Sequence, residues 1–298
     1  MPRCLLNRRL IAALLLLLTS AGAQAAGVPI PHGTLELISE NQSIAPGQQF
    51  YLGLHFQLEK DWHIYWVNPG DSGQPPRVAW RLPTGFTAGE MEWPAPRRMG
   101  TSSIVDFGYH DEVTLLVPMH APAGLAAQQP ARLIAEVKVL VCREMCIPGK
   151  AQVSLALSVK SQPPAPDART RELFTATRKS LPRPAPAGWK FSAEDAKDSF
   201  VLTANIGQQV TQAVFFPLAE SQMENAAPQV LQPAPAGFRL TLKKSDRLLK
   251  PIDRLKGVLV LSGERAYRID VPLSTAGVAR IDHGIGIQPG LSFEEGQE

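Results

Sequence analysis

The chain has 298 residues, with 30 Lys and Arg against 27 Asp and Glu and a formal net charge of +3. Because Arg3, Arg8 and Arg9 supply positive charge at the very N-terminus, the rest of the chain is close to neutral, and a nucleic-acid partner is not expected. Beyond the N-terminal segment no stretch approaches ~18 consecutive apolar residues, so no membrane span is expected after that segment.

Residues 1–25 are predicted to be a secretory signal peptide. The basic start is followed by the short apolar run Leu10–Leu18 and by small residues at Ala23–Ala25, where cleavage is expected. Cys4 leaves with this segment. The remaining pair, Cys142 and Cys146, then meets an oxidising compartment, where such a pair becomes a disulfide or is actively kept reduced.

The region 26–160 is predicted to form short strands, because apolar residues recur at every second position between turn residues. The composition of Asn68–Gly73 predicts a loop. Strands are expected at Thr34–Ile38, Gln49–Leu58, Trp62–Trp66, Val78–Leu82, Phe86–Trp93, Glu112–Met119, Arg132–Cys142 and Gln152–Val159.

A proline-rich segment, 161–188, is predicted to be a stiff linker between two domains. Between its two proline clusters, Asp167 is expected to cap a short helix that carries Leu173, Phe174 and Thr177 on one face.

The region 189–273 again has the alternation of strands, and the Gly-rich, polar tail 274–298 is expected to be disordered. The predicted fold is therefore all-β, with two β-sandwiches in series joined by the Pro-rich linker and its short helix; barrels are the competing all-β architecture. Strands are expected at Phe200–Asn205, Gln212–Phe216, Phe238–Leu242, Gly257–Leu261 and Arg265–Val271.

Alternation also predicts where the cysteines lie. Cys142 ends its strand on the charged face, so it is expected to point away from the core. Cys146 is expected within a hairpin loop, Arg143–Lys150, which contains Pro148 and Gly149. The pair should therefore lie at a sheet end with a path to solvent. The apolar face of the same strand carries Leu133, Ala135, Val137, Val139 and Val141.

Three roles for the pair are open. A structural bridge closing about five residues would remove only about 2 kcal/mol of chain entropy, and a domain of this size has its own core. A short, exposed bridge is the reducible kind, which favours redox work. The alternative is Cu(I) binding, because Cys142, Met145 and Cys146 are soft donors; none of the six histidines lies near this motif in sequence.

Two motifs together resemble a known family. Val139–Gly149, with the Cys-x3-Cys pair, and Trp62–Gly73 are similar to the periplasmic N-terminal module of DsbD/ScsB-type transmembrane thiol:disulfide interchange proteins, most of all in the ScsB-like branch, which is associated with suppression of copper sensitivity. The resemblance covers essentially the whole chain after the signal peptide. It implies a periplasmic location, immunoglobulin-like sandwiches and no cofactor.

The resemblance also implies the chemistry. Cys142 and Cys146 would be the redox pair of a protein-disulfide reductase component. Electrons would come from a membrane-embedded or thioredoxin-like donor and pass to oxidised periplasmic thiol proteins. Relatives usually continue into a transmembrane domain and a thioredoxin domain, which these residues do not include, so those parts are expected in separate proteins or a different donor is used.

Other residues gain roles only from the resemblance. Asp106, Phe107 and Tyr109 look like the family's aromatic cap loop, with Phe107 as the lid over the cysteines. His63 and Tyr65 align loosely with aromatic residues beside the pair. From the residues alone, Phe107 and Tyr109 read as core aromatics, His63 as a surface histidine and Asp106 as a turn former.

Overall fold

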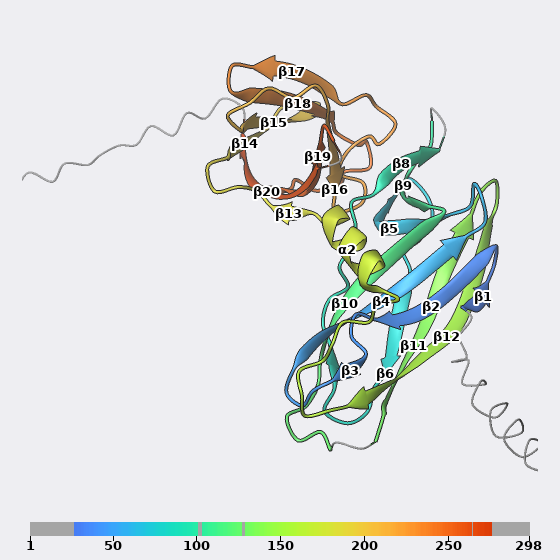
Figure 1. Ribbon diagram of the computed structural model, residues 1–298. Helices are drawn as coiled ribbons and strands as arrows, with labels where there is room; N and C mark the ends of the chain where they lie inside the picture. Colours follow the sequence, from blue (N-terminus) through green and yellow to red (C-terminus); the bar gives the residue numbers. More distant parts are fainter. Residues whose placement is uncertain (1–26, 101–102, 127–128, 264, 276–298) are drawn as a thin grey trace, which may run out of the picture.

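The computed structural model describes residues 27–100, 103–126, 129–263 and 265–275. It is all-β apart from one short helix, which lies between two β-sandwich regions (Figure 1). The predicted signal peptide and residues 276–298 of the predicted tail lie outside the described residues. Within the described part of the chain, no helix is long and apolar enough to cross a membrane.

The first domain comprises β1 to β12 and consists of two packed sheets. One sheet is antiparallel with the order β1-β2-β4-β10-β7. Its central strand, predicted from the sequence, buries one apolar face, with Leu52, Leu54 and Phe56 fully inaccessible. The strands are β1 (Val28–Ile30), β2 (Gly33–Ser39), β4 (Gln49–Leu58), β7 (Thr87–Ala88) and β10 (Glu112–His120).

The other sheet of this domain has the order β3-β12-β11-β5-β9-β8, with β6 also paired to β11. As the alternation predicted, the apolar face of β11 from Leu133 to Val141 is buried in the core. The strands are β3 (Ser43–Ile44), β5 (His63–Gly70), β6 (Arg77–Arg81), β8 (Arg97–Gly100), β9 (Val105–His110), β11 (Ala131–Cys142) and β12 (Cys146–Val159).

The hairpin that carries the cysteines differs from the prediction. β12 starts at Cys146, and Pro148 and Gly149 lie inside the strand rather than in a loop. At this end β12 pairs only with β11, because β3 meets it at Ser158 and Val159. A proline is tolerated on such a free edge because no ladder hydrogen bond is required of it there. The turn is thus only Arg143–Met145.

The second domain comprises β13 to β20, in a sheet with the order β16-β19-β20-β14-β15-β18-β17 and with β13 paired to β20. This sheet curls on itself, so that β14, β15 and β18 face β16, β19 and β20 across their own core (Figure 1). The strands are β13 (Arg183–Pro184), β14 (Lys190–Asp195), β15 (Ser199–Asn205), β16 (Ala213–Pro217), β17 (Val230–Ala234), β18 (Gly237–Lys243), β19 (Arg254–Leu261) and β20 (Arg265–Thr275).

The predicted boundaries of this region need two corrections. β20 runs to Thr275, because its last residues pair in parallel with β14, so the predicted tail begins at least two residues too early. β13 belongs to the proline-rich segment but pairs with β20, so that segment is not a free linker.

The helix between the domains is α2 (Arg171–Ser180), within the predicted stretch. Phe174 and Thr177 are buried as expected. Asp167 is not the cap: the N-cap is Thr170, and the Asp167 carboxylate instead accepts hydrogen bonds from the backbone N–H and the guanidinium of Arg169. An N-cap at Asp167 would require the helix to start at the next residue, but it starts three residues later, at Arg171.

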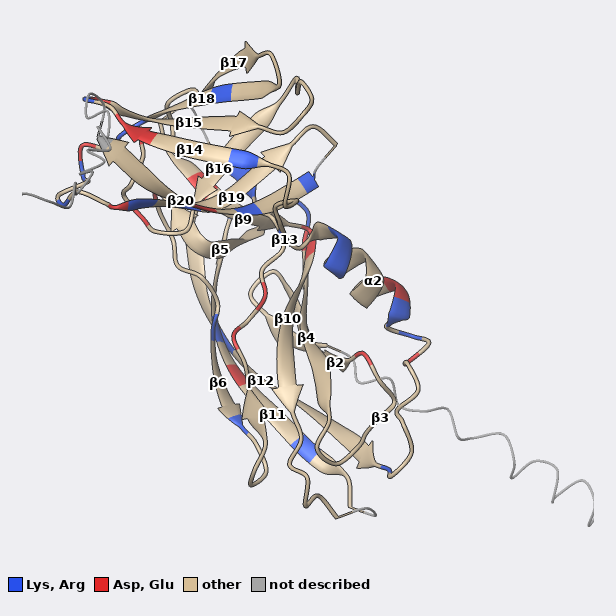
Figure 2. Ribbon diagram, turned by 90° about the vertical axis from the view of Figure 1, so that its left-hand side faces the viewer, with Lys and Arg blue, Asp and Glu red and all other residues tan. Residues whose placement is uncertain are grey.

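The two domains share a contact surface. The Phe216 ring of the second domain packs edge-on against Phe107, with centroids 5.1 Å apart, and against Trp66 at 6.3 Å. The side-chain amide of Asn68 donates to the carbonyl of Pro217 at 2.8 Å. Figure 2 shows the domains end to end, with basic and acidic positions interspersed along both. Domain docking therefore fixes the end of β5, which leads into the site.

Candidate functional site

Cys142 and Cys146 form a disulfide with an S–S distance of 2.04 Å. They face each other across the β11–β12 ladder. Cys142 is only 1 % exposed, whereas Cys146 is exposed at the start of β12. The pair was expected to have a path to solvent, but Cys142 is buried, with β12 on one side of it and β5 on the other, where His63 lies directly opposite. The exposed cysteine of the pair is therefore Cys146.

Titratable side chains line the sheet beside the disulfide. His63 pairs with Cys142 on one side and with His110 on the other, and directly opposed residues share a face of the sheet. Tyr65 lies two residues along β5, on the same face. Its hydroxyl is 3.4 Å from the Sγ of Cys146. The structure thus places His63 beside Cys142 and Tyr65 beside Cys146.

The segment after β5 folds back over Tyr65. A Cβ on Gly73 would lie 2.1 Å from the Cζ of Tyr65, and the φ of this glycine is +79°, so only glycine fits here. Tyr65 is 1 % exposed as a result. Sequence reasoning predicted a loop at Asn68–Gly73 but not that it covers the site; its first residues, Asn68–Gly70, belong to β5. The sequence signal that could have indicated this covering segment is Asp-Ser-Gly directly after a strand rich in aromatic residues.

The expected cap loop is corrected by the structure. Asp106–Tyr109 lies inside β9, so its side chains alternate between the two faces of the sheet. Phe107 and Tyr109 face the core, where Phe107 is 1 % exposed and the Tyr109 hydroxyl donates to Pro94 O at 2.8 Å. Phe107 is therefore a core residue on the face away from the disulfide.

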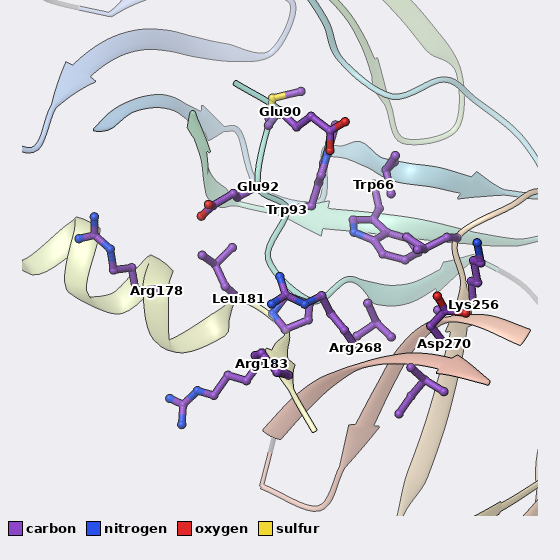
Figure 3. Close-up of a pocket in the computed structure, with 18 of the residues that line it drawn as sticks. Trp66, Glu90, Glu92, Trp93, Arg178, Leu181, Arg183, Lys256, Arg268 and Asp270 are labelled. Carbon is purple, nitrogen blue, oxygen red and sulfur yellow. The ribbon is translucent and has the colours of Figure 1, made fainter. Parts of the chain in front are cut away.

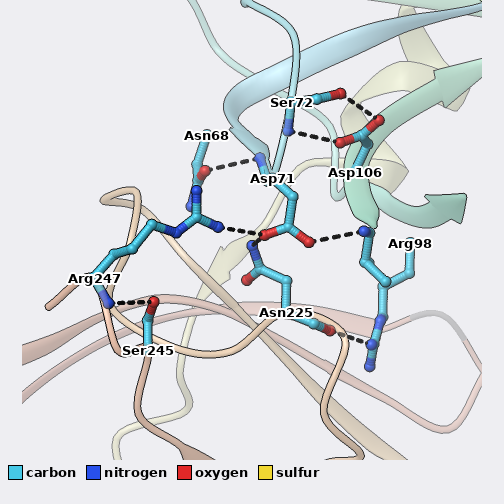
Figure 4. A network of polar contacts seen from close by, with 10 residues as sticks. Asn68, Asp71, Ser72, Arg98, Asp106, Asn225, Ser245 and Arg247 are labelled. Carbon is cyan, nitrogen blue, oxygen red and sulfur yellow. Dashed lines mark hydrogen bonds and ion pairs between the residues drawn. The ribbon is translucent and has the colours of Figure 1, made fainter. Parts of the chain in front are cut away.

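Asp106 faces the site side of the sheet and is neither a lid residue nor a turn former. Its carboxylate accepts hydrogen bonds from the backbone N–H and the hydroxyl of Ser72, each at 2.9 Å (Figure 4). Burial raises the pKa of Asp106, and the hydrogen bonds from Ser72 oppose this. Asp106 thus holds the segment that covers Tyr65.

The surroundings of the pair are largely uncharged. Burial, together with the nearby His110, lowers the pKa of His63 to about 4. Its Nε2 is buried and has no hydrogen-bond partner among the described residues, so His63 is not the surface histidine that was expected. Burial also raises the pKa of Tyr65. At neutral pH both side chains are therefore neutral. The nearest cation along the chain, Arg143, lies over the Trp62 ring at 5.3 Å.

We expect His63 to make the fold sensitive to acid. The pKa of His63 is about 4 in the fold and has an ordinary value of 6.5, so the fold favours the neutral imidazole. Its contribution to the free energy of unfolding is therefore fully present above pH 6.5 and is lost as the pH falls through 4. The loss should reach about 3 kcal/mol. Urea unfolding of wild type and His63→Gln at pH 7 and pH 4 measures it. The acid-induced loss should shrink in His63→Gln and persist in the exposed-site control His120→Gln; an equal loss in wild type and His63→Gln would contradict the assignment.

The soft donors considered for Cu(I) are close together but differently placed. Met145 is 67 % exposed in the turn between the two cysteines. Among the residues that the structure describes, no group of three or more His, Cys, Asp or Glu side chains is arranged to hold a metal ion. Copper binding by Cys142, Met145 and Cys146 stays a prediction.

A separate cavity of about 780 Å³ lies between the domains. Figure 3 shows Trp66 and Trp93 of the first domain opposite Lys256, Arg268 and Asp270 of the second. Its lining includes neither cysteine. The disulfide instead lies at the turn of the β11–β12 hairpin, where Cys146 is exposed.

Residues 34–158, which include both cysteines, match the family described as "Thiol:disulfide interchange protein DsbD, N-terminal". Among solved structures, the N-terminal periplasmic domain of ScsB from Proteus mirabilis is similar, with a TM-score of 0.59 and 17 % identity over 81 % of this chain and 92 % of that one. The tandem Ig repeats of Dlar cover 82 % of this chain and 99 % of their own, with 11 % identity and a TM-score of 0.21.

A search of curated proteins found no significant match. The likeness to the Proteus mirabilis domain extends over both sandwiches and shows a shared fold. The family match covers the first domain, its Cys-x3-Cys pair and the strands that surround it. The first domain of this protein therefore belongs to the DsbD N-terminal domain family of thiol:disulfide interchange proteins.

Proposed function

We propose that this protein exchanges thiols and disulfides in the periplasm through Cys142 and Cys146. Electrons would pass from a membrane-embedded or thioredoxin-like donor to oxidised periplasmic proteins. The observation that carries the proposal is the disulfide itself, which closes a three-residue turn and joins an exposed cysteine to a buried one. The periplasmic origin of the similar ScsB domain supports the location.

The two sulfurs would have different tasks. A thiolate of the donor attacks the exposed Sγ of Cys146, the Cys142–Cys146 bond breaks, and Cys142 leaves as a thiolate that takes up a proton. A second donor thiolate then attacks the donor sulfur of the mixed disulfide, which releases Cys146 as a thiolate and leaves the donor oxidised. Both cysteines are then reduced.

Delivery runs in the opposite direction. The Cys146 thiolate attacks a disulfide of the oxidised protein and displaces one of its sulfurs as a thiol. Cys142 then attacks Cys146, so the original disulfide reforms and the second sulfur of the substrate leaves. Two electrons are transferred, and the substrate disulfide becomes two thiols.

Neighbouring side chains favour this division of tasks between Cys146 and Cys142. The protonated hydroxyl of Tyr65 is in contact with Cys146 Sγ and is able to donate a hydrogen bond to the thiolate that forms there. The neutral imidazole of His63 lies beside the buried Cys142, and its Nε2 has no hydrogen-bond partner in the part of the chain that the structure describes; this nitrogen would accept a hydrogen bond from the Cys142 thiol.

A redox titration tests the proposal. The folded protein would be equilibrated in glutathione or dithiothreitol buffers, trapped by alkylation and weighed by mass spectrometry. We expect a single two-electron transition at a potential above about −300 mV, the range of exchangeable rather than structural disulfides. A parallel titration with Cu(I) would show whether the reduced pair also binds copper. A disulfide that is reduced only after unfolding would return the pair to a structural role.

A further inference from the structure

Asp71, which precedes the residues that cover Tyr65, is bonded to the second domain. The Oδ1 of Asp71 accepts hydrogen bonds from the side-chain amide of Asn225 at 2.8 Å and from the guanidinium of Arg247 at 3.3 Å (Figure 4). The Oδ2 accepts the backbone N–H of Val105 at 2.8 Å. The Asp71 side chain is 11 % exposed, so this carboxylate depends on these partners to remain buried.

The partners from the second domain are themselves fixed. Asn225 is 5 % exposed, and its backbone carbonyl accepts a hydrogen bond from the guanidinium of Arg98 in the first domain. The backbone N–H of Arg247 is bonded to the Ser245 hydroxyl at 3.1 Å. Asn225 is thus bonded to the first domain both through its side chain, at Asp71, and through its backbone, at Arg98.

Contacts continue from Asp71 to the exposed sulfur. Ser72, the next residue, is bonded twice to Asp106. Gly73 follows and lies in contact with the Tyr65 ring, and the Tyr65 hydroxyl touches Cys146 Sγ. Three consecutive residues therefore connect the second domain to the side chain that contacts the reactive sulfur.

We propose that Asn225 and Arg247 of the second domain are positioning residues for the redox site: by holding Asp71, they keep the 71–73 segment on Tyr65 and the Tyr65 hydroxyl on Cys146. This rests on the proposed function, since it assigns the second domain a part in the reactivity of Cys146. When the hydrogen bonds from Asn225 and Arg247 are lost, Asp71 moves toward solvent and the 71–73 segment moves away from Tyr65. The Cys146 thiolate then loses the Tyr65 hydroxyl as a hydrogen-bond donor.

The test uses the full chain after reduction. The rate of alkylation of Cys146 by iodoacetamide is measured from pH 5 to 9, with mass spectrometry to assign the modified cysteine, and gives the pKa of the Cys146 thiol. The variants are Tyr65→Phe, Asn225→Ala, Arg247→Ala and the double variant Tyr65→Phe/Asn225→Ala. Arg247→Lys keeps the charge. Arg239→Ala removes an arginine of an exposed ion pair elsewhere in the second domain and is the matched control.

Loss of one hydrogen bond to a thiolate should raise the thiol pKa by about one unit, so alkylation at neutral pH should slow about tenfold in Tyr65→Phe and Asn225→Ala. Arg247→Ala should shift in the same direction by less, because the Arg247 side chain is 66 % exposed. Arg247→Lys and Arg239→Ala should match wild type. The double variant should be no slower than Tyr65→Phe, since both changes act on the same contact. Apart from Tyr65 itself, the charged and titratable groups near Asp71 and Cys146 stay unchanged in Tyr65→Phe and Asn225→Ala: Asp106, Arg98, His63, His110, Arg143 and Arg247.

Two results would overturn the proposal: a wild-type pH profile in both Asn225→Ala and Arg247→Ala, or a double variant whose slowing is the full sum of the two single effects. Arg247→Ala changes an exposed side chain, so the test stands even if Asn225→Ala does not fold. Neither result touches the exchange function, which is decided by the redox titration of wild type. A wild-type disulfide that resists reduction in the folded protein would instead overturn the exchange function, and this proposal with it.

Discussion

A Cys142→Ser variant is expected to accumulate as a mixed disulfide through Cys146, whereas Cys146→Ser is expected to remain unreacted. Cys146 is exposed and Cys142 is 1 % exposed, so a protein thiol reaches only the first. Without Cys142 no second cysteine remains among the described residues to resolve the mixed disulfide, and without Cys146 the remaining thiol is buried. Both variants should lose all exchange turnover, because each lacks one of the two sulfurs that hold the electrons.

The trapping is measured by mixing each variant with a thioredoxin-like protein or a disulfide-bonded substrate and separating the products on non-reducing gels. The double variant Cys142→Ser/Cys146→Ser is the control for nonspecific adducts. Stable adducts of Cys146→Ser, with none of Cys142→Ser, would reverse the assignment of the attacked sulfur. Retained turnover in either single variant would exclude a two-cysteine cycle.

Phe107→Ala is expected to destabilise the protein by about 3–5 kcal/mol. The side chain is 1 % exposed and packs in the core against Phe216 of the second domain, so its removal leaves a cavity where the two domains meet. A lid over the cysteines would cost far less stability when truncated. Urea unfolding followed by circular dichroism measures the difference.

Phe86→Ala is the matched control, since Phe86 is also buried in the first domain but its ring partner is Phe50. Combined with Phe216→Ala, Phe107→Ala should show a coupling energy of about 0.5–1.5 kcal/mol, and Phe86→Ala should show none. A loss below about 1 kcal/mol for Phe107→Ala would contradict the core assignment.

Much of the fold follows from local pattern. Alternation predicted the all-β class, most of the strands and the buried face of β11, because the period of a strand is two wherever one face is covered. The spacing of Phe174 and Thr177 predicted the buried face of α2 in the same way. Several strands were missed. Among them, β14 buries only Ala193 fully and β17 buries no residue fully, so the alternation of these two is weak.

The segment Asp106–Tyr109, which was expected to be a cap loop, shows where local sequence pattern is not enough to predict the conformation. A short sequence with an acid, two aromatics and a glycine has the composition of a loop, yet the same residues extend as β9 because β5 and β8 pair with it on both sides. Glycine is required at Gly108 for a non-local reason, since a Cβ there would lie 2.1 Å from the carbonyl oxygen of Ile64. The neighbouring strand decided the conformation.

The sequence by itself determined the strand pattern, the pair of cysteines and the resemblance that the family match bears out for the first domain. Only the tertiary structure decided that Cys146 is exposed and Cys142 buried, that Tyr65 contacts the sulfur, and that Asp71 is held by the second domain. The physical reason is that alternation specifies which face of a strand a residue occupies but not which strand lies beside it. Asn225 and Asp71 are separated by 154 residues, and their contact exists only because the two sandwiches pack together.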